Sequence, residues 1–155
     1  MHYRWTTFDD LSTAQLYELL AFRQDVFIVE QASPYQDLDG LDPACWHLLV
    51  RQRPGGPLVG CLRARGPQGD DPAFIGRIVV APAQRGTGLG RRLVAEGIAL
   101  LNRLHPRCDI RIGAQAHLEA YYAGFGFVRD GEVYDDGGVP HVTMWRRLPH
   151  DQVAA

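Results

Sequence analysis

The sequence lacks the features that identify several large classes of protein. Its 155 residues contain no apolar run of membrane-spanning length, and the first five residues do not begin a signal peptide. The three cysteines are odd in number and form no CxxC pair, so we expect reduced thiols, mostly buried, at Cys45, Cys61 and Cys108. Together these absences predict a cytoplasmic protein with no membrane partner.

An excess of positive charge is also absent. Lys and Arg together number 16 and Asp and Glu 18, which gives a formal net charge of −2. Nucleic-acid-binding domains usually carry a large basic field, so we do not expect nucleic acid as a partner. With 46% hydrophobic and 22% charged residues the chain has an ordinary globular composition. Its length fits a single domain over residues 1–155.

Periodicity and turn signals divide the chain into helices and strands. Ser12 and Gln15 have the spacing of a capping box, and a helical apolar pattern then continues to about residue 28. The later predicted elements are strands at 45–51, 58–65 and 74–80, a helix ending near 104, a strand at 110–114, a short helix at 117–124, and a hairpin of 127–134 and 139–147. Gly97 interrupts the apolar stripe of the long helix, which predicts close packing there. The order predicts an α/β protein of the α+β type, a sheet with helices packed on it.

The most informative segment follows the strand at 74–80. It reads Arg85-Gly86-Thr87-Gly88-Leu89-Gly90-Arg91, so three alternate glycines open a helix. Glycine lets the backbone approach a ligand closely, and the exposed amides of a helix start favour an anion. Arg91 occupies the third position of a dinucleotide fingerprint GxGxxG, and the chain has no Walker GxxxxGK run. The loop therefore predicts a phosphate or pyrophosphate site of another type.

Residues 31–43 are loop-like and acidic. If Gly40 were the obligatory glycine of an EF-hand, Tyr35 would occupy the first ligand position and Trp46 the last, so that motif fails at both ends. No other group of residues has metal-ligand spacing, and we expect no metal site. The nucleophile motif GxSxG is absent as well. We expect the acidic residues of this loop to be solvated rather than to form a docking patch for a cationic substrate.

Two motifs resemble those of the GNAT superfamily of acetyltransferases. Arg85, Gly88 and Gly90 match its coenzyme A signature Arg-x-x-Gly-x-Gly, and Tyr122 stands four residues before Gly126-Phe127, as in the later motif of the family. More narrowly, the chain resembles the ElaA-like branch over about residues 5–147, through 26–31, 35–42, 47–48, 114–117 and 140–141. Ser33 departs from this pattern, because a cysteine is expected there.

This resemblance implies a fold and a cofactor. The fold would have a mixed, mostly antiparallel sheet, helices on both faces and a V-shaped splay between the strands at 74–80 and 110–115. Acetyl-CoA would bind in the splay, with its pantetheine arm along the first strand and its pyrophosphate on the amides of residues 86–90, close to Arg85, Arg91 or Arg92. The implied cofactor-binding residues are Ile78, Val79, Val80, Arg85, Gly86, Thr87, Gly88, Leu89, Gly90 and Arg91.

The resemblance also implies direct acetyl transfer to a primary amine of a small molecule or peptide. An amine of pKa about 10.4 must lose a proton before it attacks. The developing oxyanion needs a donor, which we expect to be a backbone N–H near Val79 or Val80. Tyr122 matches the usual acid of the family, whereas Tyr121 is expected to be a core aromatic. The base stays open among four residues, of which the first two are favoured: Glu30, His141, His47 and His117.

Two other functions stay open. The chain could be a non-catalytic domain that senses or carries coenzyme A, although the presence of Tyr122 favours an enzyme. It could also transfer a longer acyl chain, because residues 26–30 resemble a segment of acyl-homoserine-lactone synthases. The sequence does not identify the amine or the oligomeric state, for which a homodimer is one option.

Overall fold

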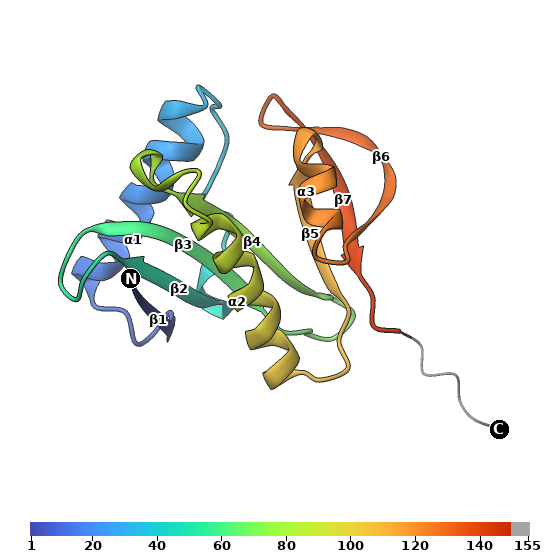
Figure 1. Ribbon diagram of the computed structural model, residues 1–155, viewed down its shortest axis with the longest axis horizontal. Coiled ribbons are helices and arrows are strands. Elements are labelled where there is room, and N and C mark those ends of the chain that lie inside the picture. The colour runs from blue at the N-terminus through green and yellow to red at the C-terminus, as the bar shows by residue number, and fades with distance from the viewer. Residues whose placement is uncertain (150–155) are drawn as a thin grey trace.

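The computed structural model describes residues 1–149, which form one seven-stranded sheet with helices packed against it (Figure 1). Ser12 begins the first helix with the predicted capping box. In chain order the elements are β1 (His2–Thr7), α1 (Thr13–Gln24), a π-helical turn (Asp25–Glu30), a 3₁₀ turn (Asp42–Ala44), β2 (Trp46–Arg51), β3 (Leu58–Arg65), β4 (Ala73–Val80), a 3₁₀ turn (Pro82–Gln84), α2 (Leu89–Leu104), β5 (Ile110–Gln115), a 3₁₀ turn (Ala116–Leu118), α3 (Glu119–Ala123), β6 (Val128–Asp136) and β7 (Val139–Arg146).

The sheet has the strand order β1-β2-β3-β4-β5-β7-β6, and every neighbouring pair except β4 and β5 is antiparallel. The parallel β4–β5 ladder consists of two residue pairs, Ala73 with Ile110 and Phe74 with Arg111. Beyond Phe74 the two strands diverge (Figure 1). This arrangement confirms the predicted mixed sheet and its splay.

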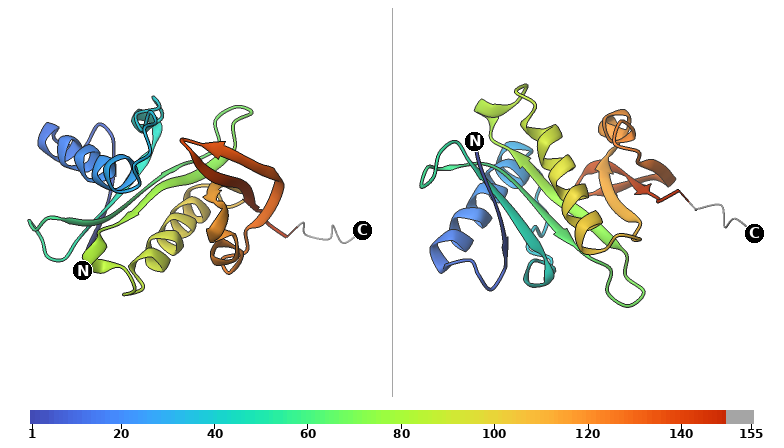
Figure 2. Two further views of the ribbon diagram at one scale, coloured as in Figure 1. Left: turned by 90° about the horizontal axis from the view of Figure 1, so that it is seen from above. Right: turned by 60° about the horizontal axis from the view of Figure 1, so that its bottom comes forward.

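Helices cover both faces of the sheet. α1 lies on one face, and α2 and α3 lie on the other (Figure 2). The larger apolar cluster packs between the sheet and α2 and includes Leu62, Ile75 and Leu93. Gly97 of α2 lies in this contact, where a Cβ would come within 3.2 Å of side-chain carbons of Leu62 and Ile75. The predicted close packing at Gly97 is therefore confirmed.

β4 carries a bulge in the middle of its length. Cys61 of β3 pairs with Val79 and Arg63 pairs with Gly76. The same stretch of the ladder therefore advances by two residues on β3 and by three residues on β4. The extra residue lies next to Arg77, whose φ of +49° is in the left-handed region. An L-residue adopts this conformation only where its surroundings hold it, and a bulge re-aims the strand beyond it. The segment Ile78–Val80 therefore owes its direction to this distortion.

Several elements differ from the prediction. β1 was not predicted, because its sequence HYRWTT is mostly polar and its burial comes from pairing with β2 at the sheet edge. The first helix ends at Gln24 and continues as a π-helical turn. Asp135 and Asp136 belong to β6, so the hairpin turn is Gly137-Gly138 alone. The three cysteines are free as predicted, although Cys108 is only half-buried.

Candidate active site

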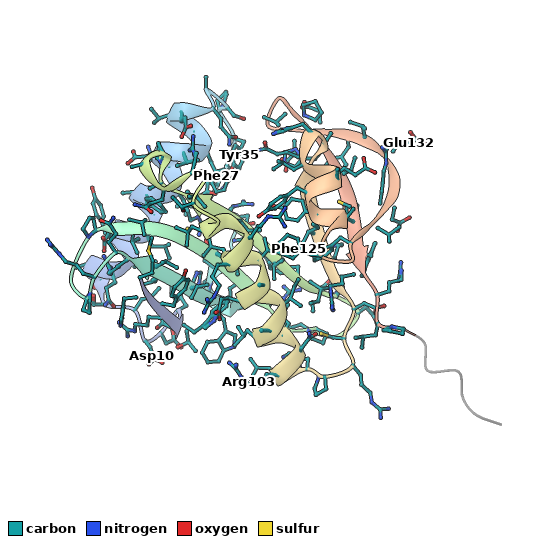
Figure 3. All side chains as sticks on the ribbon, in the orientation of Figure 1. Asp10, Phe27, Tyr35, Arg103, Phe125 and Glu132 are labelled. Carbon is teal, nitrogen blue, oxygen red and sulfur yellow. The ribbon has the colours of Figure 1, made fainter. Side chains whose placement is uncertain are left out.

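A cavity of about 890 Å³ occupies the opening between β4 and β5. One wall consists of β4, the start of the glycine loop and the π-helical turn. The opposite wall consists of β5, α3 and the β6–β7 hairpin. Phe27 and Tyr35 lie on the first side near the opening, and their rings meet edge to face with centroids 6.5 Å apart (Figure 3).

Six of the predicted cofactor-binding residues line this cavity. They are Ile78, Val79, Val80, Arg85, Gly86 and Gly90. Because the β4–β5 ladder stops at Phe74, the edge of β4 from Gly76 onward has no ladder partner on the β5 side among the described residues. A strand edge of this kind offers backbone N–H and C=O groups to an extended ligand.

The remaining four predicted residues belong to the glycine loop and the start of α2. Gly88 has a φ of +89° and caps α2, and among residues 1–149 no atom beyond the chain neighbours lies within 4 Å of a Cβ built on Gly86 or Gly88. The loop is therefore open at its glycines, as close approach by a ligand requires. Thr87 donates its hydroxyl to the Gln84 carbonyl at 2.6 Å, and the Leu89 side chain is buried in the core.

Arg85 and Glu30 form an ion pair at the mouth of the cavity. Arg85 Nη2 donates to Glu30 Oε2 at 2.8 Å, and Nη1 donates to the other carboxylate oxygen. The hydrogen bond from Arg85 lowers the pKa of Glu30 below its usual value. Both oxygens of Glu30 are thus engaged, which makes it a weaker base than a free carboxylate.

Tyr122 is buried, with 8% of its surface exposed, and it borders the cavity. Its ring packs edge to face on Tyr121 and Phe127, at centroid distances of 5.1 and 6.2 Å. Burial, with a smaller contribution from Tyr121, raises the pKa of Tyr122 to about 12. Its phenol is therefore protonated at neutral pH, as a general acid must be.

Tyr121 packs against the edge of the core, as expected, but it also faces the cavity. It is only half-buried, lines the cavity and lies beside the glycine loop. The Arg91 guanidinium carbon is 5.4 Å from the centre of its ring, and its hydroxyl oxygen lies 3.4 Å from where a Cβ of Gly90 would be. The two adjacent tyrosines therefore border different parts of the same cavity.

The structure separates the three candidate histidines. His141 of β7 and the exposed His117 line the cavity, whereas His47 does not. His47 is buried on β2 with Nε2 2.9 Å from the Asp42 carbonyl, and burial lowers its pKa. His141 Nδ1 lies 2.7 Å from the Val139 carbonyl oxygen, which can only accept, so Nδ1 carries a proton. In the neutral ring Nε2 then has a free lone pair, and it lies 4.0 Å from Asp136 Oδ2.

The expectation that the acidic loop is solvated is wrong. Asp37 and Asp42 are 6% and 5% exposed, and both bind the fully buried Arg23. Arg23 Nε donates to Asp37 at 3.0 Å and Nη1 donates to Asp42 at 2.7 Å. Asp39 in turn accepts from Arg63 Nη1 at 2.8 Å. The loop therefore folds over the sheet because its carboxylates neutralise arginines of α1 and β3.

This ion-pair network reaches the bulge of β4. Arg77 Nε lies 2.7 Å from Asp37 Oδ1, and Arg77 Nη2 donates to the Asp37 carbonyl at 3.1 Å. The network thus holds the residue with the left-handed backbone. Ser33, in the same segment, donates its hydroxyl to the Gly137 carbonyl of the β6–β7 turn and so joins the two sides of the opening.

The family follows from a comparison with known proteins. A family model described as an acetyltransferase (GNAT) domain matches residues 15–148. The chain belongs to the GNAT acetyltransferase family. Membership agrees with the splayed sheet and the open glycine loop, and it makes this GNAT protein an acyl-CoA-dependent transferase.

Relatives and solved structures place this GNAT protein in the ElaA-like branch. It is 38% identical to protein ElaA of Escherichia coli over 140 residues, 90% of this chain and 92% of that protein. It is 42% identical to UPF0039 protein sll0451 of Synechocystis over 151 residues, 96% of this chain and 97% of that one.

Two crystal structures show the same fold. That of E. coli ElaA superposes with a TM-score of 0.87 at 36% identity and covers 95% of this chain and 100% of that one. That of an acyl-CoA N-acyltransferase from Pseudomonas aeruginosa gives a TM-score of 0.87 at 38% identity, with 94% and 99% covered. No helix within residues 1–149 of this GNAT protein is long and apolar enough to cross a membrane.

Proposed function

We propose that this chain transfers the acetyl group of acetyl-CoA to a primary amine by direct attack, with Tyr122 as the general acid. One observation supports the proposal: a single cavity brings together three features. They are the edge of β4 that has no ladder partner on the β5 side among the described residues, the open glycine loop, and the two tyrosines Tyr121 and Tyr122. An extended anionic thioester and an acid for its leaving group would meet there.

The chain offers a fit for the cofactor along β4 and the loop. The main chain of Ile78, Val79 and Val80 would bind the pantetheine arm, and the amides of residues 86–90 would bind the pyrophosphate. Arg85 and Arg91 would add positive charge, Arg85 by exchanging Glu30 for a phosphate. Acetyl-CoA supplies the acyl group as a thioester.

The residues of the cavity can account for each proton and charge. The amine nitrogen bonds to the thioester carbon while the carbon–sulfur bond breaks. A backbone N–H near Val79 or Val80 stabilises the negative charge on the carbonyl oxygen. Tyr122 gives its hydroxyl proton to the departing sulfur, and His141 Nε2 takes a proton from the amine, directly or through water.

The raised pKa of Tyr122 is compatible with this role. A phenol of pKa about 12 is a weaker acid than a free thiol, whose reference pKa is about 8.5. The burial that weakens the phenol also makes a thiolate in the same cavity more basic, because both lose solvation of their charged forms. Proton transfer from Tyr122 to sulfur therefore depends on their contact within the cavity.

Two measurements test the proposed function. Acetyl-CoA at about 100 times its dissociation constant should stabilise the fold by about 2.7 kcal/mol, and NAD at equal concentration by much less. With a panel of primary amines, free thiol should appear only when a suitable amine is present. Equal stabilisation by NAD and acetyl-CoA would remove the cofactor assignment. Binding of acetyl-CoA without thiol release by any amine would favour a sensor or carrier domain instead.

A further inference from the structure

Three side chains form a row across the sheet at the point where β4 and β5 part. Arg65 of β3 pairs in register with Phe74 of β4, and Phe74 pairs with Arg111 of β5. Residues paired directly opposite each other on neighbouring strands project to the same face of a sheet. All three residues line the cavity, so this row places two arginines and one aromatic residue in its wall.

Arg65 is a buried cation without a carboxylate partner. It is 7% exposed, and its guanidinium carbon lies 4.8 Å from the centre of the Phe74 ring. Its Nη2 makes a long hydrogen bond of 3.5 Å to the Pro72 carbonyl, and its Nε has no acceptor in the part of the chain that the structure describes. Within residues 1–149 no carboxylate oxygen lies within 4.0 Å of it. An unpaired buried charge is costly, so a residue of this kind marks a place where an anion is expected.

The neighbouring arginine on the same face of β3, Arg63, does have carboxylate partners. Arg63 is 4% exposed, and it forms ion pairs with Asp39 and Asp42. The acidic loop therefore neutralises Arg63 and leaves Arg65, two residues further along the strand, without a counter-ion.

Arg111 adds a second positive charge to the row. It is exposed on β5, and it too has no carboxylate oxygen within 4.0 Å among the described residues. Asp71 lines the same cavity but forms no ion pair with either arginine. Both arginines lie at the end of the cavity where the β4–β5 ladder stops, while Tyr122 and the glycine loop border other parts of its wall.

We propose that Arg65 and Arg111 bind a carboxylate of the acceptor, so that the substrates are amines that carry a carboxylate. This inference rests on the proposed acetylation of an amine. Phe74 lies four residues before Ile78, which is at most about 13 Å because the bulge shortens the strand, and the arginine side chains span part of that distance. The amine and the carboxylate of the acceptor are therefore several bonds apart, as in an ω-amino acid or at the C-terminal lysine of a peptide.

The test compares two product probes that differ only in this charge. 6-Acetamidohexanoate and 6-acetamidohexanamide are titrated by calorimetry into the full-length protein saturated with coenzyme A. The carboxylate should bind at least about tenfold more tightly, because a charge-assisted hydrogen bond contributes more than a neutral one. Arg111→Gln and Arg65→Gln should each reduce that preference to a few-fold. Arg103→Gln, which changes an exposed arginine near the far end of α2, should leave it intact (Figure 3).

The outcomes separate this inference from the proposed function. Equal binding of the two probes, binding of neither, or an unchanged preference in Arg111→Gln would overturn the carboxylate site. Arg111 is exposed, so that variant stays informative even if Arg65→Gln does not fold. A third probe, a tripeptide ending in N-ε-acetyllysine, identifies a peptide terminus as the source of the carboxylate if it binds more tightly than the hexanoate. Failure of every amine to release thiol, with the carboxylate preference intact, would overturn the proposed function alone.

Discussion

Tyr122 and Tyr121 are neighbours in the chain but have different surroundings. Tyr122 is buried in the core against Phe127, whereas the half-buried Tyr121 packs at the edge of the core and also contacts Arg91 beside the glycine loop. We expect Tyr122→Phe to leave folding and acetyl-CoA affinity nearly unchanged, because it removes one oxygen and almost no volume. The turnover number should fall by about 10²–10⁴, the usual contribution of a positioned acid. Single-turnover thiol release measures this effect without interference from product release.

Tyr121→Phe is the matched comparison. Because Tyr121 borders the loop, its loss should act on the KM for acetyl-CoA more than on turnover. Equal turnover in Tyr122→Phe and the parent would remove the acid role, and a large loss of turnover in Tyr121→Phe alone would transfer it. Since the pKa of Tyr122 is about 12, the phenol keeps its proton up to about pH 10. At any pH lower than this, the parent enzyme should lose no activity through deprotonation of Tyr122.

The sequence predicted some of the residues that line the cavity but not others. Tyr122 was found through its spacing before Gly126-Phe127, and the structure places it on the cavity. Arg65 was missed, because a single arginine in a strand does not show which face it occupies or whether it has a counter-ion. The available signal was the alternation of Arg63 and Arg65 in an otherwise apolar strand, which places two charges on one face.

The glycine loop and α2 act as one element, and Gly88 joins them. With a φ of +89°, Gly88 holds a conformation that β-branched residues rarely adopt, and the space beside it is open. Gly88→Val therefore combines backbone strain with a side chain where a phosphate would approach. We expect acetyl-CoA affinity to fall at least about tenfold while the fold survives, measured by calorimetry and by thermal unfolding.

Gly55→Val is the control for this element. Gly55 also has a positive φ, +75°, and open space around it, but it lies in the β2–β3 turn away from the cavity. The substitution Gly55→Val should lower the free energy of unfolding by about as much as Gly88→Val does, and it should leave the affinity for acetyl-CoA unchanged. If Gly88→Val binds acetyl-CoA as the parent does, the pyrophosphate is held by another part of the chain.

At the scale of elements, the prediction was accurate where local signals are strong. The capping box, α2 and β3 appear as expected, because their apolar patterns and turn residues agree. β1 was missed because its pattern is weak and its stability comes from pairing with β2. The bulge in β4 was not predicted either, since the local sequence shows neither the positive φ of Arg77 nor its ion pair with the distant Asp37.

For the whole molecule, the ion-pair network predicts a loss of stability in acid. Burial alone would raise the pKa of Asp42, but the hydrogen bond and charge of Arg23, together with Arg63, hold it below the usual value. The pKa of Asp39 is also lowered, by Arg63 against the effect of burial. A depressed folded-state pKa gives stability that is fully present well above the unfolded value of about 3.8 and is lost progressively as the pH falls through that value toward the lower folded one. The free energy of unfolding in urea should therefore fall between pH 5 and pH 3.

Asp42→Asn tests that attribution. It leaves two buried guanidinium groups underpaired and should cost about 3–5 kcal/mol at pH 7. Its stability should then change less between pH 5 and pH 3 than that of the parent, because one of the responsible carboxyls is gone. An equal loss in both proteins over that interval would place the acid sensitivity outside the network.

The global arrangement was predicted by resemblance and not by local pattern. Nothing in the residues of β4 and β5 says that their ladder stops after two pairs, so the splay followed only from the likeness to GNAT proteins. The burial of Asp37 and Asp42 depends on arginines from α1 and β3, and composition alone suggested a solvated loop. Charge pairing between distant segments is a property of the folded chain, and single-sequence patterns do not contain it.

The hydrogen bond from Ser33 to Gly137 has a consequence for biosynthesis. These residues are separated by 104 positions, and the two walls of the cavity come from segments before and after α2, residues 26–90 and 111–141. A ribosome makes the chain from its N-terminus, so the segment through the glycine loop is complete while β5, α3 and β7 are still being made. Contacts between residues so far apart in the chain carry the largest loop-closure cost. The cavity is therefore completed only when the last hairpin docks, and no shorter intermediate possesses it.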